Sequence, residues 1–405
     1  VLLVAGPRIE QYFLRKYYYY PHASRSLSAL FAPMTGFPAV LRARSPYQRI
    51  DLMEDVDSDP SRELMRHYSA KLADVDVPAD HILFLNGDFQ TNTTYEEVYH
   101  EYFAHVPVAA TGRVPERVLV LGGGDGFLLR ELVKYAGIRS IVHVDIDPVL
   151  PELAATHPVL LAANRGAFDD PRIERHVGDG FQFVRTTDER WDAIYIDFPV
   201  AVDYDLARLY SREFFHFVRL RMAPRGFAVF DATGISLLTI PGADGHQALV
   251  EGNDWPIYCH TLMAAGFEQI VPFLSTLEID NPAAAAWLET SDLEFTVGRD
   301  FLRAWHAAEE GEERDVLRGL LVQRALTEHV LSLQQGFVML GERPGVLTAR
   351  WHDPGVETYL LTEERFDAAL RVRFPFPAEV DPRLVNSILQ PRFPTLSVWA
   401  PRKPY

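Results

Sequence analysis

The residues best placed to do chemistry are aspartates that follow apolar runs in the middle of the chain. Asp145, Asp179 and Asp197 each end such a run, and Asp125 lies in the glycine-rich stretch "GGGDG" at residues 122–126, directly after "RVLVL". One aspartate after a strand is commonly a helix cap or a turn residue. Four of them at the ends of consecutive predicted strands indicate a ligand site.

The glycine loop decides which kind of ligand this is. A dinucleotide fingerprint requires G-x-G-x-x-G, and counting from Gly122 the third glycine position is occupied by Phe127. The carboxylate of Asp125 would also repel a pyrophosphate placed at the start of the following helix. The loop therefore fits a nucleoside without phosphates, and we expect Gly122 and Gly124 to line its site.

The other aspartates match the parts of such a nucleoside. Asp145 lies 19 residues beyond Gly126, where a carboxylate at the end of the second strand accepts hydrogen bonds from ribose hydroxyls. Asp179 is placed to accept from the exocyclic amine of adenine. These features describe an S-adenosyl sulfonium nucleoside. Asp125 then favours a donor whose tail has lost its carboxylate, because only the ammonium of the tail remains to face Asp125. Coulomb's law gives a few kcal/mol for the attraction between this carboxylate and an ammonium near a protein surface.

Strands and helices alternate around these positions. An amphipathic helix is predicted over 94–110, and the sequence then predicts strands at 117–121, 141–145, 172–177, 191–197 and 226–233, separated by helices from 127, 149 and 180 and over 206–222. Such alternation predicts an α/β fold with a doubly wound, mostly parallel sheet of the S-adenosylmethionine methyltransferase (Rossmann-like) type. Ligands bind such sheets at the carboxyl ends of the strands.

The rest of the chain divides around this region. We predict an N-terminal arm at 1–44, a small antiparallel β-hairpin domain at 45–93, a nucleoside-binding catalytic domain at 94–342 with a helical insertion at about 281–330, and a C-terminal extension at 343–405. The hairpin rests on the turn Asn86-Gly87-Asp88 between two short strands. A helix from 255 and strands at 268–275 and 336–342 complete the expected domain.

Composition limits the partners. The net charge of −17 disfavours nucleic acid and anionic membranes and favours cationic ligands. The one cysteine, Cys259, excludes an intrachain disulfide and fits a reducing compartment, and no metal-ligand spacing is found. No apolar run reaches the length of a membrane span, so the sequence predicts a soluble, cytoplasmic chain. The opening "VLLVAG" is also compatible with the end of an upstream apolar segment.

Taken together, several motifs resemble the spermidine synthase (polyamine aminopropyltransferase) family. They are "YQRI" at 47–50, "LFLNGDFQ" at 83–90, "YHEYFAHVP" at 99–107, "LGGGDG" at 121–126, "VDID" at 144–147, "AFDDPRIERHVGDGFQFV" at 167–184 and "GFVML" at 336–340. The likeness covers residues 45–342 apart from the insertion. The chain start and "DLARLYSREFF" at 205–215 are most similar to a bacterial branch in which the domain follows a membrane region, which implies an upstream membrane segment or attachment.

The resemblance implies a reaction and its residues. It implies aminopropyl transfer from decarboxylated S-adenosylmethionine, as co-substrate and without a tightly bound cofactor, to a small cationic amine, with release of methylthioadenosine by a homodimer. Tyr99 and Asp197 would act on the attacking amine, Asp197 as the proton acceptor. The residues matched to the nucleoside are Gln48, His100, Asp125, Asp145, Asp179 and Gly180.

Two positions depart from the family pattern. The fourth strand usually ends in D-x-x-D, but here Val200 takes the place of the second aspartate, and Gln335 replaces a frequent tryptophan before the last strand. Asp203 or Asp205 would have to supply the missing acceptor carboxylate from a shifted position. These changes leave three hypotheses: transfer to a putrescine-like or altered amine, an S-adenosylmethionine-dependent methyltransferase, and a non-catalytic homologue that binds a nucleoside or polyamine.

Overall fold

The structure is a computed structural model that describes part of the chain. The described residues are 39–55, 80–93, 96–201, 204–232, 235, 239–241, 247–249, 254–275, 335–371 and 374–393. The expected insertion at 281–330 and all but the last six residues of the expected arm at 1–44 lie outside them, as does Asp203. No helix among the described residues is long and apolar enough to cross a membrane.

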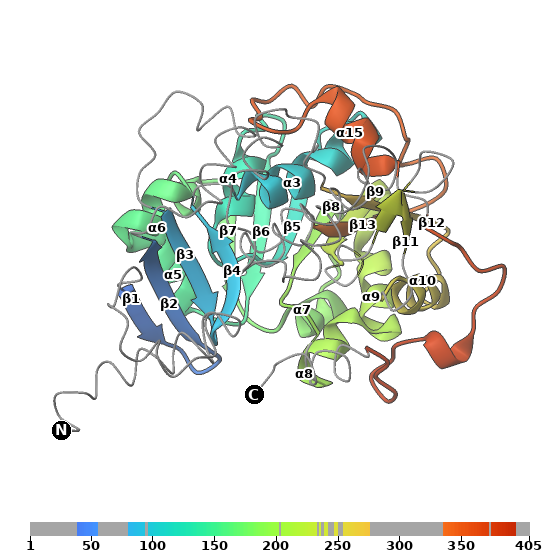
Figure 1. Cartoon of the computed structure of the whole chain (residues 1–405), viewed down its shortest axis with the longest axis horizontal. Helices are drawn as coiled ribbons and strands as arrows, with labels where there is room; N and C mark the ends of the chain where they lie inside the picture. Colours follow the sequence, from blue (N-terminus) through green and yellow to red (C-terminus); the bar gives the residue numbers. More distant parts are fainter. Residues whose placement is uncertain are drawn as a thin grey trace, which may run out of the picture.

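A seven-stranded sheet forms the centre of the molecule (Figure 1). Five adjacent strands are parallel, and β13 is antiparallel to both of its neighbours. In spatial order the strands are β12 (Gln269–Leu274), β13 (Gly336–Gly341), β9 (Met222–Asp231), β8 (Trp191–Asp197), β5 (Arg117–Gly122), β6 (Ser140–Asp145) and β7 (Ile173–Val177). The predicted doubly wound, mostly parallel sheet is confirmed.

Helices cover both faces of this sheet, as Figure 1 shows. Alternate residues of β5 belong to different cores, because successive strand side chains point to opposite faces: Val120 packs in the cluster that contains Leu128, and Leu121 in the one that contains Phe214. The helices are α3 (Glu97–Thr111), α4 (Phe127–Val133), α5 (Val149–Thr156), α6 (Pro158–Ala163), α7 (Gly180–Thr186), α8 (Tyr204–Ala207), α9 (Arg212–Arg221), α10 (Trp255–Ala264) and α15 (Glu363–Leu370).

The helix predicted over 206–222 is instead three pieces. The short α8 is followed by the 3₁₀ turn η5 (Arg208–Tyr210), and α9 begins only after Ser211. Ser211 has an extended backbone, and its hydroxyl accepts a hydrogen bond from the Phe214 amide, so it restarts the chain as a helix N-cap. The prediction of one continuous helix was therefore wrong, and the break places η5 below the carboxyl edge of β8.

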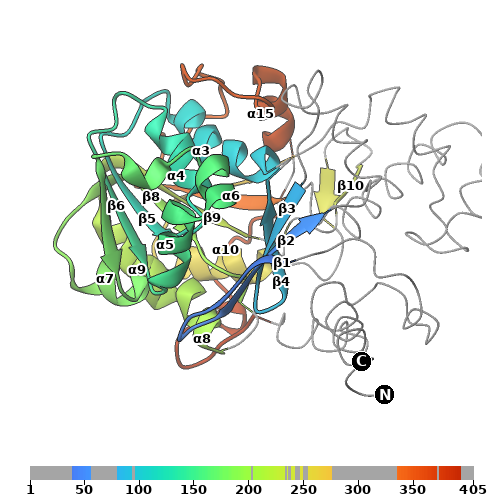
Figure 2. The same ribbon diagram turned by 90° about the vertical axis from the view of Figure 1, so that its left-hand side faces the viewer.

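A second sheet precedes the central one. Its four antiparallel strands are β1 (Ala39–Arg44), β2 (Arg49–Asp55), β3 (Asp80–Leu85) and β4 (Asp88–Asn92). The predicted hairpin is present, with Asn86 and Gly87 both at positive φ, the backbone that a tight two-residue hairpin requires. Ile50 and Leu83 of this sheet pack against Leu150 of α5, so the sheet lies beside α5 and α6 (Figure 2).

The C-terminal segment crosses both faces. Residues 346–361 lie along α3: the Thr348 amide donates to the Ala110 carbonyl, and the buried Glu101 carboxylate accepts from the amides of residues 359–361. The chain then passes α15 and reaches the opposite face, where the 3₁₀ turn η7 (Pro382–Leu384) lies near α10 (Figure 1). Residues far from the central sheet in sequence are thus packed against both of its helical layers.

Candidate active site

The carboxyl edge of the parallel strands brings the predicted acidic residues together. Gly122 pairs in register with Asp197 on β8, and Asp145 ends β6 on the other side of β5. Asp179 follows β7 and is the N-cap of α7. The sequence prediction that these strand ends form one site is consistent with this arrangement, because parallel strands end at the same edge.

The glycine loop is held tightly against two of these carboxyl groups. A side chain on Gly122, whose φ is 81°, would begin 2.1 Å from the carbonyl oxygen of Asp197. On Gly124 it would begin 2.8 Å from Oδ2 of Asp145. Glycine is therefore required at position 122, where the loop backbone lies directly against the end of β8, and position 124 packs closely against the Asp145 side chain.

Asp125 is half-buried at the turn into α4. Its Oδ1 accepts a hydrogen bond from the Phe127 amide at 2.9 Å, and its backbone carbonyl accepts from Asn164 Nδ2 at 3.0 Å. Burial raises the pKa of its carboxyl group, against the opposing charges of His100 and Arg130. A cation beside Asp125 would therefore offset a charge whose burial is costly.

Asp145 also has a carboxyl group with a raised proton affinity. Its Oδ1 accepts from the Asp147 amide at 2.8 Å, while burial, followed by the charges of Asp147, Asp125 and Asp197, raises its pKa to about 7. Asp147 also links Gln48 to this edge, because Gln48 Nε2 donates to Asp147 Oδ2 at 2.7 Å. Gln48 thus comes to the border of the site from the N-terminal sheet through a residue that the sequence analysis did not select.

Replacing Asp145 with asparagine should stabilise the ligand-free protein above neutral pH. The native pKa lies above the unfolded value of 3.8, so the native state binds more protons and wild-type stability falls as pH rises between about 4 and 7. One pKa unit corresponds to about 1.4 kcal/mol. Asparagine is itself a polar group with a desolvation cost, so we expect the free energy of unfolding to rise by only part of the full shift, about 2 kcal/mol at pH 8. Urea unfolding should show this gain shrinking at pH 5; an equal difference at both pH values would contradict the assignment.

Tyr99 and Asp197 form a direct pair. Tyr99 Oη donates to Asp197 Oδ1 at 2.7 Å, and both residues are half-buried. Burial and the neighbouring Asp125 raise the pKa of Asp197 to about 6. Burial and the charge of Asp197 also raise the pKa of Tyr99, so the phenol stays protonated and donates. Asp197 is then a carboxylate at neutral pH that is more basic than an ordinary aspartate.

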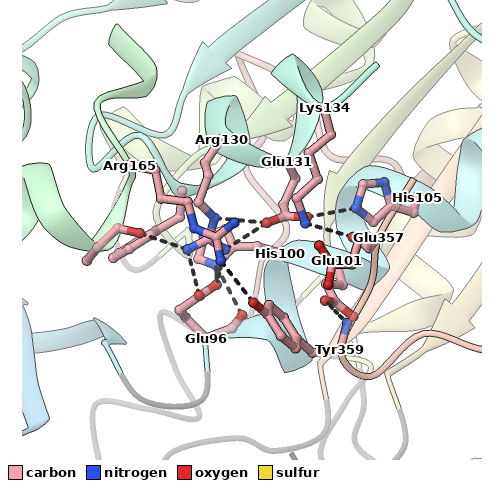
Figure 3. Close-up of polar contacts among 12 residues, drawn as sticks. Glu96, His100, Glu101, His105, Arg130, Glu131, Lys134, Arg165, Glu357 and Tyr359 are labelled. Carbon is pink, nitrogen blue, oxygen red and sulfur yellow. Dashed lines mark hydrogen bonds and ion pairs between the residues drawn. The ribbon is translucent and has the colours of Figure 1, made fainter. Parts of the chain in front are cut away.

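His100, which follows Tyr99 on α3, belongs to a buried network of charged side chains (Figure 3). His100 Nδ1 lies 3.0 Å from Glu96 Oε2, and Arg130 makes a two-point ion pair with Glu96 at 2.7 and 2.8 Å. Arg130 also pairs with Glu131 and donates to the Ala163 carbonyl. Burial lowers the pKa of His100, but the Glu96 hydrogen bond and the charges of Glu96, Asp125 and Asp197 together raise it.

Sequence reasoning missed Glu96 and Arg130. The spacing of Glu96 and His100, four residues apart on one helix, was an available signal, as was the arginine that follows the glycine loop by one helical turn. The network continues from Glu131 to His105 at 2.8 Å and from His105 to Tyr135 at 2.6 Å. The guanidinium of Arg130 is therefore engaged by protein groups and does not face the glycine loop as a free cation.

Asp179 has an arginine partner. Its Oδ1 accepts from the Phe181 amide at 2.8 Å, and its Oδ2 accepts from Arg208 Nη2 of η5 at 2.7 Å. Burial alone would raise the pKa of Asp179, but Arg208 and the helix amides outweigh it and lower the pKa. Gly180 is required here, since a side chain on it would begin 2.9 Å from the ring of Phe198. The role of Asp179 at the adenine stays a prediction.

The acceptor side contains a carboxylate that sequence reasoning overlooked. Phe230 pairs with Ile196, so Asp231 lies next to Asp197 at the end of the neighbouring strand, and it pairs with Phe337 on β13. The ring of Tyr99 packs edge-on against Phe337 with 5.1 Å between centroids. The charge of Asp231 contributes to the raised pKa of Tyr99. Its signal was the same as for the other positions, an apolar strand, "GFAVF", that ends in aspartate.

Asp205, one of the two carboxylates expected to replace the missing aspartate, is placed unfavourably. Val200 is half-buried in the loop after β8, and Asp205 is exposed in the first turn of α8. Among the described residues, no three or more histidine, cysteine, aspartate or glutamate side chains form a group that could hold a metal ion.

Comparison with known proteins agrees with this geometry. Residues 96–237 match the family model described as the spermine/spermidine synthase domain. A polyamine aminopropyltransferase of Oceanobacillus iheyensis is 39% identical over 151 residues, which are 37% of this chain and 29% of that protein. Polyamine aminopropyltransferase 1 of Streptomyces coelicolor is 40% identical over 144 residues, 36% of this chain and 27% of that protein. One from Sulfolobus acidocaldarius is 36% identical over 155 residues, 38% of this chain and 50% of that protein.

Two solved structures share the fold over most of the chain. A spermidine synthase in complex with the transition-state analogue AdoDATO has a TM-score of 0.53 at 18% identity, over 83% of this chain and 85% of that one. The spermidine synthase of Thermotoga maritima has a TM-score of 0.52 at 19% identity, over 83% and 84%. The segments matched by sequence span only about a quarter to a half of the curated relatives. The chain thus has the fold of the spermidine synthases, and its central segment is similar in sequence to the spermine/spermidine synthase domain.

Proposed function

We propose that this protein transfers an aminopropyl group from decarboxylated S-adenosylmethionine to an amine and releases methylthioadenosine. The observation that carries the proposal is the half-buried Tyr99–Asp197 pair beside Asp125 at the carboxyl edge of the sheet. This arrangement supplies a proton acceptor and a site for a cationic nucleoside tail without a phosphate site. The similarity of residues 96–237 to polyamine aminopropyltransferases supports the same reaction.

The donor would be held by the glycine loop and its neighbouring carboxylates. Asp145 would accept hydrogen bonds from the ribose, and Asp179 would lie near adenine. Asp125 would face the ammonium of the aminopropyl chain, with Gln48 and His100 closing the site. S-Adenosylmethionine carries an additional carboxylate, which would meet Asp125 without a free cation, because Arg130 is already paired with Glu96 and Glu131. This disfavours the methyltransferase alternative.

The chemical step needs no covalent enzyme intermediate, because the sulfonium is already an activated leaving group. The nitrogen lone pair of the amine attacks the propyl carbon attached to sulfur, the C–S bond breaks with its electron pair going to sulfur, and neutral methylthioadenosine leaves. The amine proton passes to the Asp197 carboxylate, a general base. Tyr99 donates to Oδ1 of Asp197, which leaves Oδ2 for the substrate, and the protein's main task is in-line positioning.

Asp231 is our candidate for the acceptor's second cation. It lies next to Asp197 at the strand ends, and the loop after Asp197 lacks the usual second aspartate because that position is Val200. A hydrogen bond to a charged group contributes about 1.5–3 kcal/mol, so Asp231→Asn should raise KM for the best amine about ten- to a hundredfold with donor binding unchanged. Asp203→Asn and Asp205→Asn test the competing carboxylates. A raised KM in either of them, with Asp231→Asn unaffected, would move the anchor into the loop.

One screen distinguishes the remaining functions. Mass spectrometry with labelled decarboxylated donor and a panel of putrescine, cadaverine, agmatine, spermidine and amino-acid amines should reveal an aminopropylated product. Val200 favours a non-catalytic nucleoside or polyamine binder as the second candidate, and tight methylthioadenosine binding without any product would support it. Tighter calorimetric binding of S-adenosylmethionine than of its decarboxylated form would overturn the donor assignment.

Three further features are predictions from the resemblance. These are a homodimer, an upstream membrane segment, and a location in the cytoplasm or as the soluble domain of a membrane-attached protein. Light scattering of the purified chain tests the first. Fractionation of cells that express the complete reading frame tests the other two.

A further inference from the structure

Residues 381–393, which we call the strap, contact the η5 turn. Two side chains of η5, Arg208 and Tyr210, make hydrogen bonds at the site. The strap lies outside the segment similar to the spermine/spermidine synthase domain, residues 96–237. Its central residue, Asn386, is fully buried. The η5 turn that it contacts lies between α8 and α9, directly after the loop that follows Asp197.

Asn386 uses all of its polar groups in this contact. Its Nδ2 donates to the carbonyls of Ala207 at 2.8 Å and Tyr210 at 2.9 Å, the residues at the two ends of η5. Its amide donates to Thr261 Oγ1, its carbonyl accepts from the Arg212 amide, and its Oδ1 accepts from the Arg392 amide. A short helix or turn leaves its last carbonyls without partners of its own, and the Asn386 side chain donates to that of Ala207, the last residue of α8, and to that of Tyr210, the last residue of η5.

The side chains of η5 point to two different parts of the site. Arg208 donates to Asp179 Oδ2 at 2.7 Å and packs over the ring of Phe181. Tyr210 Oη donates to the carbonyls of Phe198 and Pro199, both at 3.1 Å, the residues directly after Asp197. One turn therefore supports the expected adenine side through Arg208 and the expected amine side through Tyr210.

Aromatic packing ties the strap to the same turn. The ring of Phe393 lies 5.8 Å from that of Tyr210 and 4.8 Å from that of Tyr258 on α10. The Ile388 amide donates to Glu213 Oε2, and the Asp381 amide donates to His260 Nδ1. The strap is thus fixed to α9 and α10 on either side of Asn386, so a shift of Asn386 would be transmitted to η5.

From these contacts we infer that Asn386 is a positioning residue for both substrates, acting through Arg208 on the nucleoside side and through Tyr210 on the amine side. The inference rests on the proposed function for the identity of the two substrates. The structural part of the inference, that the strap holds η5 and the loop after Asp197, is independent of the proposed function. Displacing a reacting group by about 1 Å can cost about a hundredfold in rate, so partial loosening should be measurable.

Four variants test the inference. Tyr210→Phe should raise KM for the amine about tenfold and leave Kd for methylthioadenosine within twofold. Arg208→Gln should raise Kd for methylthioadenosine about tenfold and leave KM for the amine, measured at saturating donor, within twofold. Asn386→Ala should raise both KM for the amine and Kd for methylthioadenosine. Leu389→Ala, on the strap but with a side chain 91% exposed, is the matched control and should behave as wild type.

The outcomes separate positioning from mere folding. A smaller folded fraction lowers apparent kcat and leaves KM and Kd unchanged, so Asn386→Ala with unchanged constants would overturn the inference. If Asn386→Ala does not fold, the other two variants decide: Tyr210→Phe should affect mainly KM for the amine, and Arg208→Gln mainly Kd for methylthioadenosine. Equal effects on KM and Kd in both variants would refute the inference. A wild-type protein that neither binds methylthioadenosine nor forms product refutes the proposed function instead. In that case faster hydrogen exchange of residues 198–212 in Asn386→Ala than in Leu389→Ala still supports the strap, and equal exchange refutes it.

Discussion

Replacing Asp197 with asparagine is expected to lower kcat by about a thousandfold while Kd for methylthioadenosine stays within a few fold. A positioned general base contributes about 10²–10⁴, and asparagine keeps an oxygen that can accept from Tyr99 Oη, at present 2.7 Å away. The geometry is therefore preserved and only the proton acceptor is lost. Steady-state kinetics at saturating donor, together with calorimetry of nucleoside binding, measure the two quantities.

The pH dependence gives an independent check on the same residue. Burial raises the pKa of Asp197 to about 6 in the ligand-free protein, and only the deprotonated form can accept a proton. The kcat/KM of the wild type should therefore rise as pH increases through about 6, a limb that Asp197→Asn should lack, apart from the slope due to amine deprotonation. Parallel loss of turnover and nucleoside binding would show instead that Asp197 is structural.

The candidate residues at the carboxyl edge of the sheet could be predicted from the sequence, because the same pattern marks a strand and the residue at its end. Each apolar run of the central region ends in a glycine or an aspartate, and parallel strands bring those ends to one edge. Asp125, Asp145 and Asp197 could be selected in this way without knowing any contact. Asp231 carries the same signal, because it follows the apolar run "GFAVF", although sequence reasoning did not select it.

The supporting contacts could not be predicted in this way, because they join distant parts of the chain. Arg208 reaches Asp179 only because Ser211 interrupts the expected helix and turns η5 toward α7. Gln48 reaches the site through Asp147, 99 residues away in sequence. Hydrophobic periodicity places a residue on a face of its own element, but it does not say which side chain of another element lies opposite.

The second large effect is expected at Asp125, where asparagine should weaken binding of the decarboxylated donor about a hundredfold. Two unit charges 4 Å apart interact by about 4 kcal/mol at an effective dielectric constant of 20, and the cost of burying the Asp125 carboxylate offsets part of this. Burial raises the pKa of Asp125, so the effect of its charge should be larger at pH 8 than at lower pH, and pH 8 is the better condition for the measurement. Calorimetry with the intact donor and an inactive acceptor analogue gives the affinity.

Methylthioadenosine provides the matched comparison, because it has the same nucleoside but no ammonium. Asparagine can still accept the hydrogen bond from the Phe127 amide, which Asp125 accepts at 2.9 Å, so the loop should keep its shape and methylthioadenosine affinity should change by less than threefold. The preference for the decarboxylated donor over S-adenosylmethionine should fall for the same reason, since the repulsion of the extra carboxylate is removed with the charge. If both nucleosides lose affinity equally, Asp125 shapes the glycine loop and does not recognise the cation, and the decarboxylated donor would need another source of selectivity.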